Sequence, residues 1–309
     1  MDKTKRNSLF GIILLLITSI IWGLAFIAQS DAMAHIGPLT MNGFRTLLGA
    51  IVLLPVVFIS DKIKGKKITL LGTTNNNEKK HTLIAGLLCG IAIALASTIQ
   101  QYGIIYTTIG KSGFLTTLYV VFVPLLALLF GKRVNWNGWV AVVIALLGMF
   151  LICIEKGEPL NVGDLLIIVS AFFFAVHIII VDKYASRIDG IRLSFMQFAV
   201  CGVLNTIFAL IFEEIDFIAL GNATISIIYA GVISGAIGYT LQIVAQKWVA
   251  PNIAPLIMCL ESVFALLAGA ILRHEEMIFQ VYLGCALVFI AIILAQIDFS
   301  SLKKKSNNS

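Results

Sequence analysis

The stretch SLFGIILLLITSIIWGLAFIA, residues 8–28, decides the fold class of this chain. A helix needs about 20 apolar residues to cross about 30 Å of hydrocarbon, and this run reaches that length without a charged residue. Nine further stretches of the 309-residue sequence share the pattern, so we predict an all-α integral membrane protein with ten transmembrane helices. The predicted spans are residues 8–28, 39–59, 83–105, 112–131, 136–154, 163–182, 191–212, 224–246, 252–272 and 277–297.

The composition agrees with lipid as the solvent of most side chains. Hydrophobic residues make up 59% of the chain and charged residues 12%, against about 25% charged in soluble domains. The net charge of +6 comes from short basic runs between apolar segments, which does not form the basic face that nucleic-acid binding needs. The five cysteines lie inside apolar segments without a CxxC pair, so we expect core residues and no metal or cofactor.

The basic residues also predict the orientation of the chain in the membrane. With the N-terminus in the cytoplasm, 18 of the 22 Lys and Arg residues fall on the cytoplasmic side. Three fall outside, at Lys111, Lys156 and Arg273, and Arg45 lies within a span. Positive residues are retained on the cytoplasmic side of membranes. We therefore expect a multi-pass protein of the cell membrane, with both termini cytoplasmic.

Two halves of five spans each meet near Pro159 and resemble each other weakly at an offset of 142 residues. The offset places IQQYGIIYTTIG around Gln100 on LQIVAQKWVAPN around Gln242, and both halves carry a GxxxG in the corresponding helix. Because five is odd, the second half must insert upside down. We predict a five-helix repeat over residues 1–158 and an inverted repeat over 159–309, which ends in a short basic cytoplasmic tail. A central cavity would lie between them.

Five patterned apolar segments carry a resemblance to a known family. They are IIWGLAFIA in the first span, FRTLLGAIVLLP (44–55), GFLTTLYVVFVPLLALLFGKR (113–133), LESVFALLAGAILRHEE (260–276) and the following YLGCALVFIAIIL. In their order and spacing they resemble the drug/metabolite transporter superfamily, specifically its ten-helix members with two EamA domains. The resemblance covers essentially residues 8–298. It departs at Ser262, where the family often has Pro, and at Lys132-Arg133, which replace an acidic residue.

The resemblance implies a secondary transporter or exporter whose cavity is lined mainly by spans 1, 3, 4, 6, 8 and 9. Substrates across such transporters include amino acids, amines, nucleosides, vitamins and drugs. We therefore expect a small polar or amphipathic metabolite to cross by alternating access, with proton coupling left open. The expected partners are this substrate and the lipid bilayer, and the chain would act as a monomer or homodimer.

Ionisable groups inside spans are costly and usually functional. Glu261 in span 9 could bind a cationic group, carry a proton or serve as a structural partner, and its counterpart by the offset is Tyr119. Arg45 in span 2, whose counterpart is Gln197, is expected to be gating or structural rather than a substrate contact. His177 in span 6 is either a hydrogen-bonded core residue or a group that titrates near neutral pH.

Three uncharged side chains complete the candidate substrate site. Gln100 and Gln242 are related by the repeat, and a buried amide needs a partner, which can be substrate, water or a neighbouring helix. Trp22 lies in the middle of a span, where it can stack on a ligand, attract an ammonium group or simply fill space. The candidate substrate-binding set is therefore Trp22, Gln100, Tyr119, His177, Gln242 and Glu261.

Two competing functions were weighed against transport. An intramembrane enzyme needs a nucleophile–base or metal constellation, and the partial matches at Gly110-Lys111-Ser112 and His274-Glu275 complete neither a P-loop nor an HExxH motif. We therefore expect no catalytic residues. A receptor or structural subunit would normally carry an exposed domain or long loops, which this sequence lacks.

Overall fold

A computed structural model describes residues 3–65, 67–107, 109–129, 131, 136–153, 161–250, 253–273 and 279–296, and within these ranges the regular structure is helical. The first half contains α1 (Lys3–Met33), α2 (Pro38–Ile63), α3 (Asn76–Ile104), α4 (Ile109–Thr116), α5 (Tyr119–Leu129) and α6 (Trp136–Cys153). The second half contains α7 (Val162–Ala185), α8 (Gly190–Phe212), α9 (Phe217–Asn222), α10 (Thr224–Ile228), the π-helix η1 (Tyr229–Tyr239), α11 (Thr240–Ala245), α12 (Ala254–Met258), α13 (Leu260–Arg273) and α14 (Phe279–Gln296).

The apolar segments form a ten-helix arrangement. Among the described residues, eight helical segments are long and apolar enough to cross a membrane, and two shorter apolar helices lie at Gly138–Gly148 and Tyr282–Leu294. The predicted all-helical membrane fold is therefore confirmed. The predicted repeat boundary at residues 158–159 and the basic tail at 303–305 lie outside the described residues.

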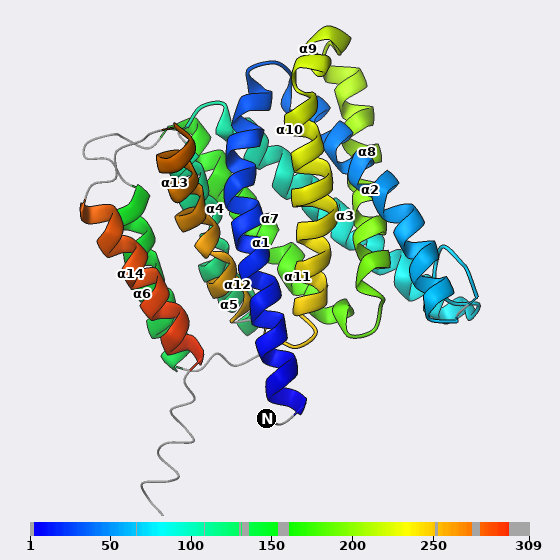
Figure 1. Ribbon diagram of the computed structural model, residues 1–309, viewed down its shortest axis with the longest axis horizontal. Helices are drawn as coiled ribbons and strands as arrows, with labels where there is room; N and C mark the ends of the chain where they lie inside the picture. The colour runs from blue at the N-terminus through cyan, green and yellow to red at the C-terminus, as the bar shows by residue number, and fades with distance from the viewer. Residues whose placement is uncertain are drawn as a thin grey trace, which may run out of the picture.

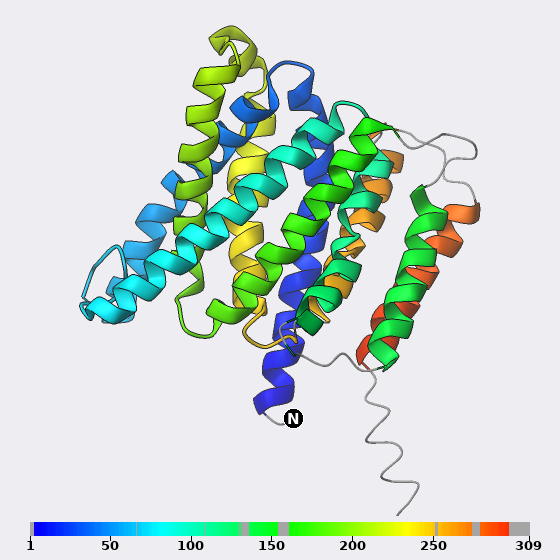
Figure 2. The ribbon, with the colours of Figure 1, turned by 180° about the vertical axis from the view of Figure 1, so that it is seen from behind.

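The packing of the helices repeats between the two halves. Helix α3 of the first half packs against α8 of the second, and its counterpart η1 of the second half packs against α2 of the first; likewise α1 packs against α13, and α7 against α5. Two pairs, α2 with α8 and α6 with α14, join counterparts directly and flank the bundle (Figure 1). The chain reverses direction with each span, so α1 and its counterpart α7 run in opposite senses (Figures 1 and 2). This is the contact pattern of two inverted five-helix repeats.

The two GxxxG motifs mark corresponding close helix contacts. A Cβ atom added to Gly90 of α3 would lie 3.0 Å from the carbonyl oxygen of Gln197 on α8. One added to Gly231 of η1 would lie 2.5 Å from the carbonyl oxygen of Arg45 on α2. The distance at Gly231 is shorter than real Cβ contacts and the distance at Gly90 is tighter than most of them, so glycine favours the close approach of these backbones.

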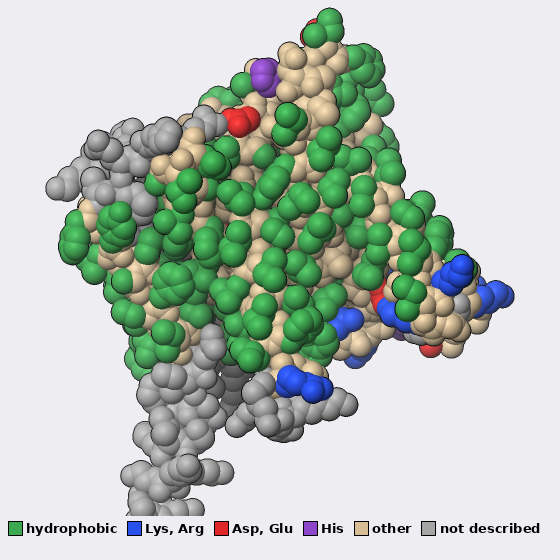
Figure 3. All heavy atoms as spheres, in the orientation of Figure 1, with side chains coloured by type: hydrophobic (Ala, Val, Ile, Leu, Met, Phe, Trp, Pro, Cys, Tyr) green, Lys and Arg blue, Asp and Glu red, His purple; other side chains and the backbone are tan. Residues whose placement is uncertain are grey.

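The outer surface is apolar along the flanks and charged at the ends. Figure 3 shows hydrophobic side chains over the sides of the bundle and Lys and Arg side chains gathered at the end where α1 begins. Large side chains such as Ile51, Leu129 and Phe212 are mostly exposed there. A lipid environment explains this exposure, since a soluble protein rarely presents so large an apolar area to water.

Within the described residues, three spans are interrupted near their middle. A turn at Thr117 and Leu118 separates α4 from α5, and a turn at Cys259 separates α12 from α13. The two turns are related by the 142-residue offset. The eighth span passes from α10 through the π-helix η1 into α11. The mean hydropathy of each interrupted span stays high enough for a membrane span, so the hydropathy pattern does not reveal the interruptions.

Candidate functional site

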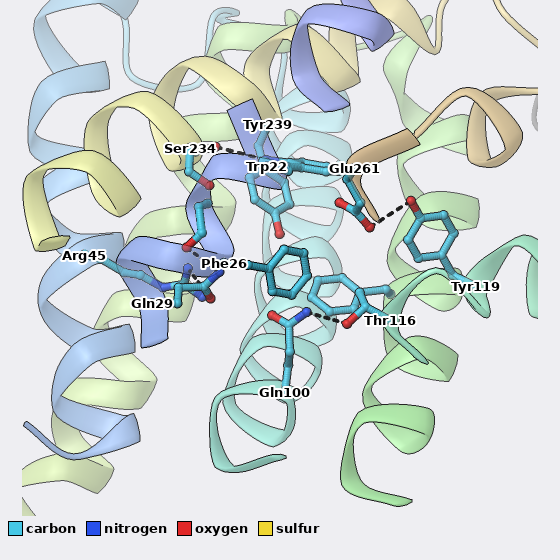
Figure 4. Close-up of a pocket in the computed structure, with 12 residues that line it drawn as sticks. Trp22, Phe26, Gln29, Arg45, Gln100, Thr116, Tyr119, Ser234, Tyr239 and Glu261 are labelled. Atoms are coloured by element: carbon cyan, nitrogen blue, oxygen red, sulfur yellow. Dashed lines mark hydrogen bonds between the residues drawn. The ribbon is translucent and has the colours of Figure 1, made fainter. Parts of the chain in front are cut away.

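A small pocket lies between the two repeats, at the level of the interrupted helices (Figure 4). Its free volume is about 40 Å³. The lining combines polar, charged and aromatic side chains from both repeats. These are Trp22, Ala25, Phe26, Gln29, Arg45, Gln100, Thr116, Tyr119, Phe174, Ser234, Tyr239 and Glu261. They come from spans 1, 3, 4, 6, 8 and 9, together with Arg45, which reaches the pocket from α2 although the family resemblance does not place that helix at the cavity.

Glu261 and Tyr119 form the acidic side of the pocket. The Tyr119 hydroxyl donates a hydrogen bond of 3.1 Å to Oε1 of Glu261, which joins the two residues that the repeat relates to each other. Each follows a turn that interrupts its span, so Tyr119 begins α5 and Glu261 lies in the first turn of α13. Both are buried. The free N–H groups at a helix N-terminus favour a negative charge there, which helps to place a carboxylate inside the bundle.

Arg45 forms the basic side of the pocket. Its Nε donates to Oδ1 of Asn42 at 2.7 Å and its Nη1 donates to Oε1 of Gln29 at 3.2 Å. The Asn42 amide in turn donates to Oγ1 of Thr98, at 3.4 Å, and the Thr98 hydroxyl donates to Oδ1 of Asn205. Side chains of α1, α2, α3 and α8 therefore hold the guanidinium in place, and they do so with neutral groups.

Aromatic rings fill the space between the acidic and basic sides. The rings of Trp22 and Tyr239 lie 4.7 Å apart between centroids, and Phe26 and Phe174 complete the aromatic lining. Figure 4 shows Arg45 and Glu261 approaching from opposite sides, with the side chains of Phe26 and Tyr239 between them. The site can therefore offer an apolar middle flanked by a carboxyl group and a guanidinium to a small molecule.

The π-helix η1 supplies both Ser234 and Tyr239 to this lining. Its wider turns accompany three bonds to α1: the Trp22 indole donates to the Ser234 carbonyl at 3.2 Å, Thr18 donates to the Gly238 carbonyl at 3.4 Å, and the Tyr229 hydroxyl donates to the Ile21 carbonyl at 3.0 Å. π-Helical turns are rare and occur frequently at functional sites. Here the π-helix ties the eighth span to α1 beside the pocket.

Gln100 contributes a polar contact from α3. Its amide nitrogen donates to the Thr116 hydroxyl at 2.8 Å, so the end of α4 and the pocket face of α3 are joined. Gln242, its counterpart in α11, is buried but does not line the pocket, and its side-chain oxygen has no hydrogen-bond partner among the described residues. The repeat therefore preserves the residue but not its surroundings.

His177 and Gln197 also lie outside the pocket lining. The His177 ring nitrogen Nε2 and Oε1 of Gln197 are 2.8 Å apart, and the His177 ring packs edge-on against Tyr239 with centroids 5.8 Å apart. His177 therefore stands one layer behind the pocket. Its direct contact with substrate, like that of Gln242, stays a prediction.

Seven lining residues were not singled out from the sequence: Ala25, Phe26, Gln29, Thr116, Phe174, Ser234 and Tyr239. Most are apolar or small and look like ordinary helix-packing residues. Gln29 could have been selected from the sequence, because it is a polar residue four positions from Ala25 on the helix face that also contains Trp22. Within the described part of the chain, no group of three or more His, Cys, Asp or Glu side chains could hold a metal ion.

A bundle of inverted helical repeats with a polar pocket between them is the architecture of a membrane transporter. The family model that matches is the EamA-like transporter family, over residues 9–154 and again over 161–296. The chain belongs to this family, with two EamA domains. The resemblance inferred from the apolar segments is thereby confirmed.

Individual relatives agree with this assignment. An uncharacterized transporter of Archaeoglobus fulgidus is 26% identical over 92% of this chain and 84% of its own length. YoaV, an uncharacterized transporter of Bacillus subtilis, is 23% identical over 92% of this chain and 96% of its own. One protein of known crystal structure superposes with a TM-score of 0.74 at 14% identity, over 93% of this chain and 96% of that one, which shows the shared fold.

Proposed function

We propose that the protein is a secondary transporter that moves a small polar or amphipathic metabolite through the central pocket by alternating access. The observation that carries this proposal is a buried polar pocket whose walls come from both inverted repeats. In transporters built this way, the substrate binds near the midplane and one repeat rocks against the other. Membership of the EamA-like family supports the transport function in general.

The pocket in this structure is too small for a metabolite. Its free volume of about 40 Å³ has room for about three water molecules. Pockets that hold drug-sized ligands measure about 300–1,000 Å³. A metabolite therefore enters only when the helices around the pocket have separated on one side. Because bulky rings such as Trp22 and Phe26 line the pocket, a movement of their helices would open or close the way to it.

Proton coupling through Glu261 is part of the proposal. This carboxyl group is 3% exposed, and the only hydrogen bond it forms to a described side chain is with Tyr119. The other ionisable groups that line the same pocket are Arg45 and Tyr239. A carboxyl group that meets each side of the membrane in turn can collect a proton on one side and release it on the other.

The location of the protein and its orientation in the membrane are part of the same proposal. We place the protein in the cell membrane with both termini in the cytoplasm, and the repeats at residues 1–158 and 159–309. The gathering of Lys and Arg at the end where α1 begins supports this orientation (Figure 3). A periplasm-active reporter fused after Ser309 should stay silent, while one inserted after Asn161 should be active. The opposite result would reverse the topology.

Flux through the purified protein tests the function itself. Compounds that raise its melting temperature would be screened among amino acids, amines and nucleosides. Those that bind would then be followed as radiolabelled solutes in proteoliposomes without ATP. We expect at least one to equilibrate faster than in protein-free liposomes and to exchange against unlabelled compound. Binding without flux, or chemical conversion of the bound compound, would contradict transport.

A further inference from the structure

Two groups of helices enclose the central pocket, and each group takes helices from both repeats. In the first group α7 packs against α3, α4 and α5, and in the second group α1 packs against η1, α11, α12 and α13. Both groups contribute to the lining, for example through Gln100 of the first and Trp22 of the second. A movement of one group against the other would therefore open or close the pocket.

A buried glutamine joins the two groups on one side of the pocket. The side-chain amide of Gln101 in α3 donates a long hydrogen bond of 3.4 Å to the backbone carbonyl of Gln29 in α1. Gln101 is fully buried. Gln29 lines the pocket and lies about one turn before the end of α1 at Met33. In the orientation proposed above, this end of α1 faces the outside, so the bond lies at the outer edge of the pocket.

A second buried glutamine joins the two groups on the opposite side. The side-chain amide of Gln246, which follows α11, donates a hydrogen bond of 3.2 Å to the backbone carbonyl of Ile178 in α7. Because α7 runs opposite to α1, Ile178 lies toward the cytoplasmic end, about one turn beyond the pocket residue Phe174. The offset of 142 residues places Gln101 on Ile243, about one turn before Gln246. The repeat therefore places similar contacts at the two ends of the pocket.

The two glutamines also lack the same hydrogen bond. The side-chain oxygens of Gln101 and Gln246 have no partner among the described residues, and both side chains are at most 4% exposed. A buried polar atom without a partner costs free energy, and this cost offsets much of what the bond from the same amide contributes. If the helices separated, water would reach both ends of the amide. Each contact therefore opposes separation only weakly.

We infer that Gln101 and Gln246 are the gating residues of the outer and inner sides, and that each keeps its gate reversible because its amide oxygen has no partner while the gate is closed. This inference rests on the proposed transport function and adds the residues that control access. An apolar side chain at either position would be well accommodated in the closed gate and would meet water in the open one. It would therefore hold that gate closed.

The test replaces each glutamine by methionine, which is similarly long and unbranched but has no amide. Each substitution is combined with Ser234→Cys in the full-length protein whose five native cysteines are replaced by Ala. A membrane-impermeant thiol reagent then reports access to the pocket in right-side-out and in inside-out vesicles. Gln101→Met should slow the reaction from the outside at least about fivefold, a difference of about 1 kcal/mol, without slowing it from the inside. Gln246→Met should do the reverse.

Gln280→Met is the matched control. The amide of Gln280 in α14 also donates to a helix carbonyl, that of Leu151 in α6, at 3.0 Å, but this bond joins neither group of helices to the other. The substitution should leave both reaction rates unchanged. Each variant would first be checked for a monodisperse elution profile. Where a methionine variant fails that check, the leucine variant at the same position replaces it, with the same expected result.

Two results would overturn the inference. One is a reaction at the parent rate from the side whose gate was altered, and the other is an equal slowing from both sides. Both leave the transport function standing, because the parent protein is labelled and assayed for flux independently. Labelling of the parent from one side only, or absence of flux for every bound compound, would instead contradict the proposed function.

Discussion

The third and eighth spans occupy corresponding places in the two repeats, yet one is a regular helix and the other is not. Residues 87–97, LLCGIAIALAS, lie within the uninterrupted helix α3, and residues 229–239, YAGVISGAIGY, form the π-helix η1. The first segment has one glycine and the second has three. Glycine is a poor helix former, so the second segment gives up regular α-helical bonding more easily.

This difference shows how a repeated fold acquires an asymmetric site. The regular helix α3 presents Gln100 to the pocket, while η1 presents Ser234 and Tyr239 and receives hydrogen bonds from α1. The fourth and ninth spans differ in a second way, because they share an interrupting turn but carry Tyr119 in one and Glu261 in the other. The repeats thus share their backbone plan, and the chemistry of the pocket comes from the positions where they differ.

The largest effect is expected where the counterparts differ in charge, at Glu261 and Tyr119. Glu261→Gln should lower flux about ten- to a hundredfold, as expected for a hydrogen bond to a charged group worth about 1.5–3 kcal/mol. If the carboxyl group carries the proton, the remaining flux should no longer respond to a pH gradient. Tyr119→Phe removes one hydrogen-bond donor and should lower flux about fivefold, for a loss of about 1 kcal/mol. Initial rates in proteoliposomes measure both. A folded Glu261→Gln protein with unaltered pH-dependent flux would eliminate the proton-carrier role.

A substitution at Gly231 tests the close approach of η1 to α2. A Cβ atom there would lie 2.5 Å from the carbonyl oxygen of Arg45, so Gly231→Ala forces the two backbones apart. We expect a loss of about 1–3 kcal/mol in stability, the usual cost of overpacking, seen as a lower melting temperature in detergent. Gly221→Ala is the matched control, since a Cβ atom at Gly221 meets no atom within 4 Å. Equal melting temperatures for the two variants would contradict the packing described here.

The two related glutamines sharpen the comparison further. Gln100→Leu removes a pocket side chain that bonds Thr116, so flux should fall several-fold for a loss of about 1 kcal/mol. Gln242→Leu should leave substrate affinity unchanged, because Gln242 lies outside the pocket, and should not lower the melting temperature, because its buried oxygen has no described partner to lose. Binding and thermal-shift measurements on the two variants check this. If Gln242→Leu lost more substrate affinity than Gln100→Leu, the substrate would have to bind closer to the second repeat than we propose.

The smallest effect is expected at the ends of the α2–α8 pair. Burial raises the pKa of Asp189, but the hydrogen bond from Lys64, the backbone hydrogen bond from Arg192 and the positive charges of both side chains together outweigh it, so the pKa of this carboxyl lies below its ordinary value. A lowered folded pKa means that the contribution to stability is present at neutral pH and is lost as pH falls through that pKa. The Lys64 side chain is 44% exposed, so Lys64→Ala should cost at most about 1 kcal/mol. Melting temperatures at pH 7 and pH 3 measure it, and the difference between variant and parent should shrink at the lower pH. A difference that grows on acidification would contradict this assignment.

The sequence predicted the membrane fold because the signal is repeated ten times and the lipid core imposes one length on each span. It predicted part of the pocket because polar residues stand out in apolar helices: Trp22, Gln100, Tyr119 and Glu261 were all selected, and all line the pocket. Their binding of substrate stays a prediction. Arg45 was expected to gate or support, and it lines the pocket as well.

The rest could not be predicted for two physical reasons. Phe26 and Phe174 are apolar residues in apolar helices, so nothing in their type distinguishes a pocket face from a lipid face. His177 and Gln242 were selected as buried polar residues, but the sequence does not distinguish a polar residue that lines the pocket from one that lies behind it. His177 has a hydrogen-bond partner and the side-chain oxygen of Gln242 has none among the described residues, so the need for a partner does not separate the two kinds of position either. That distinction depends on how the helices rotate, and rotation is set by packing contacts such as those at Gly90 and Gly231.

Access to the pocket from both sides of the membrane is the central claim, and labelling of a single cysteine tests it most directly. Ser234→Cys would be introduced after Ala replaces the five native cysteines, in a variant that still transports. A membrane-impermeant thiol reagent would be applied to right-side-out and to inside-out vesicles, with and without substrate. Alternating access predicts that Cys at this pocket position reacts from both sides and that substrate slows both reactions. Reaction from one side only, or at rates that substrate does not change, would contradict it.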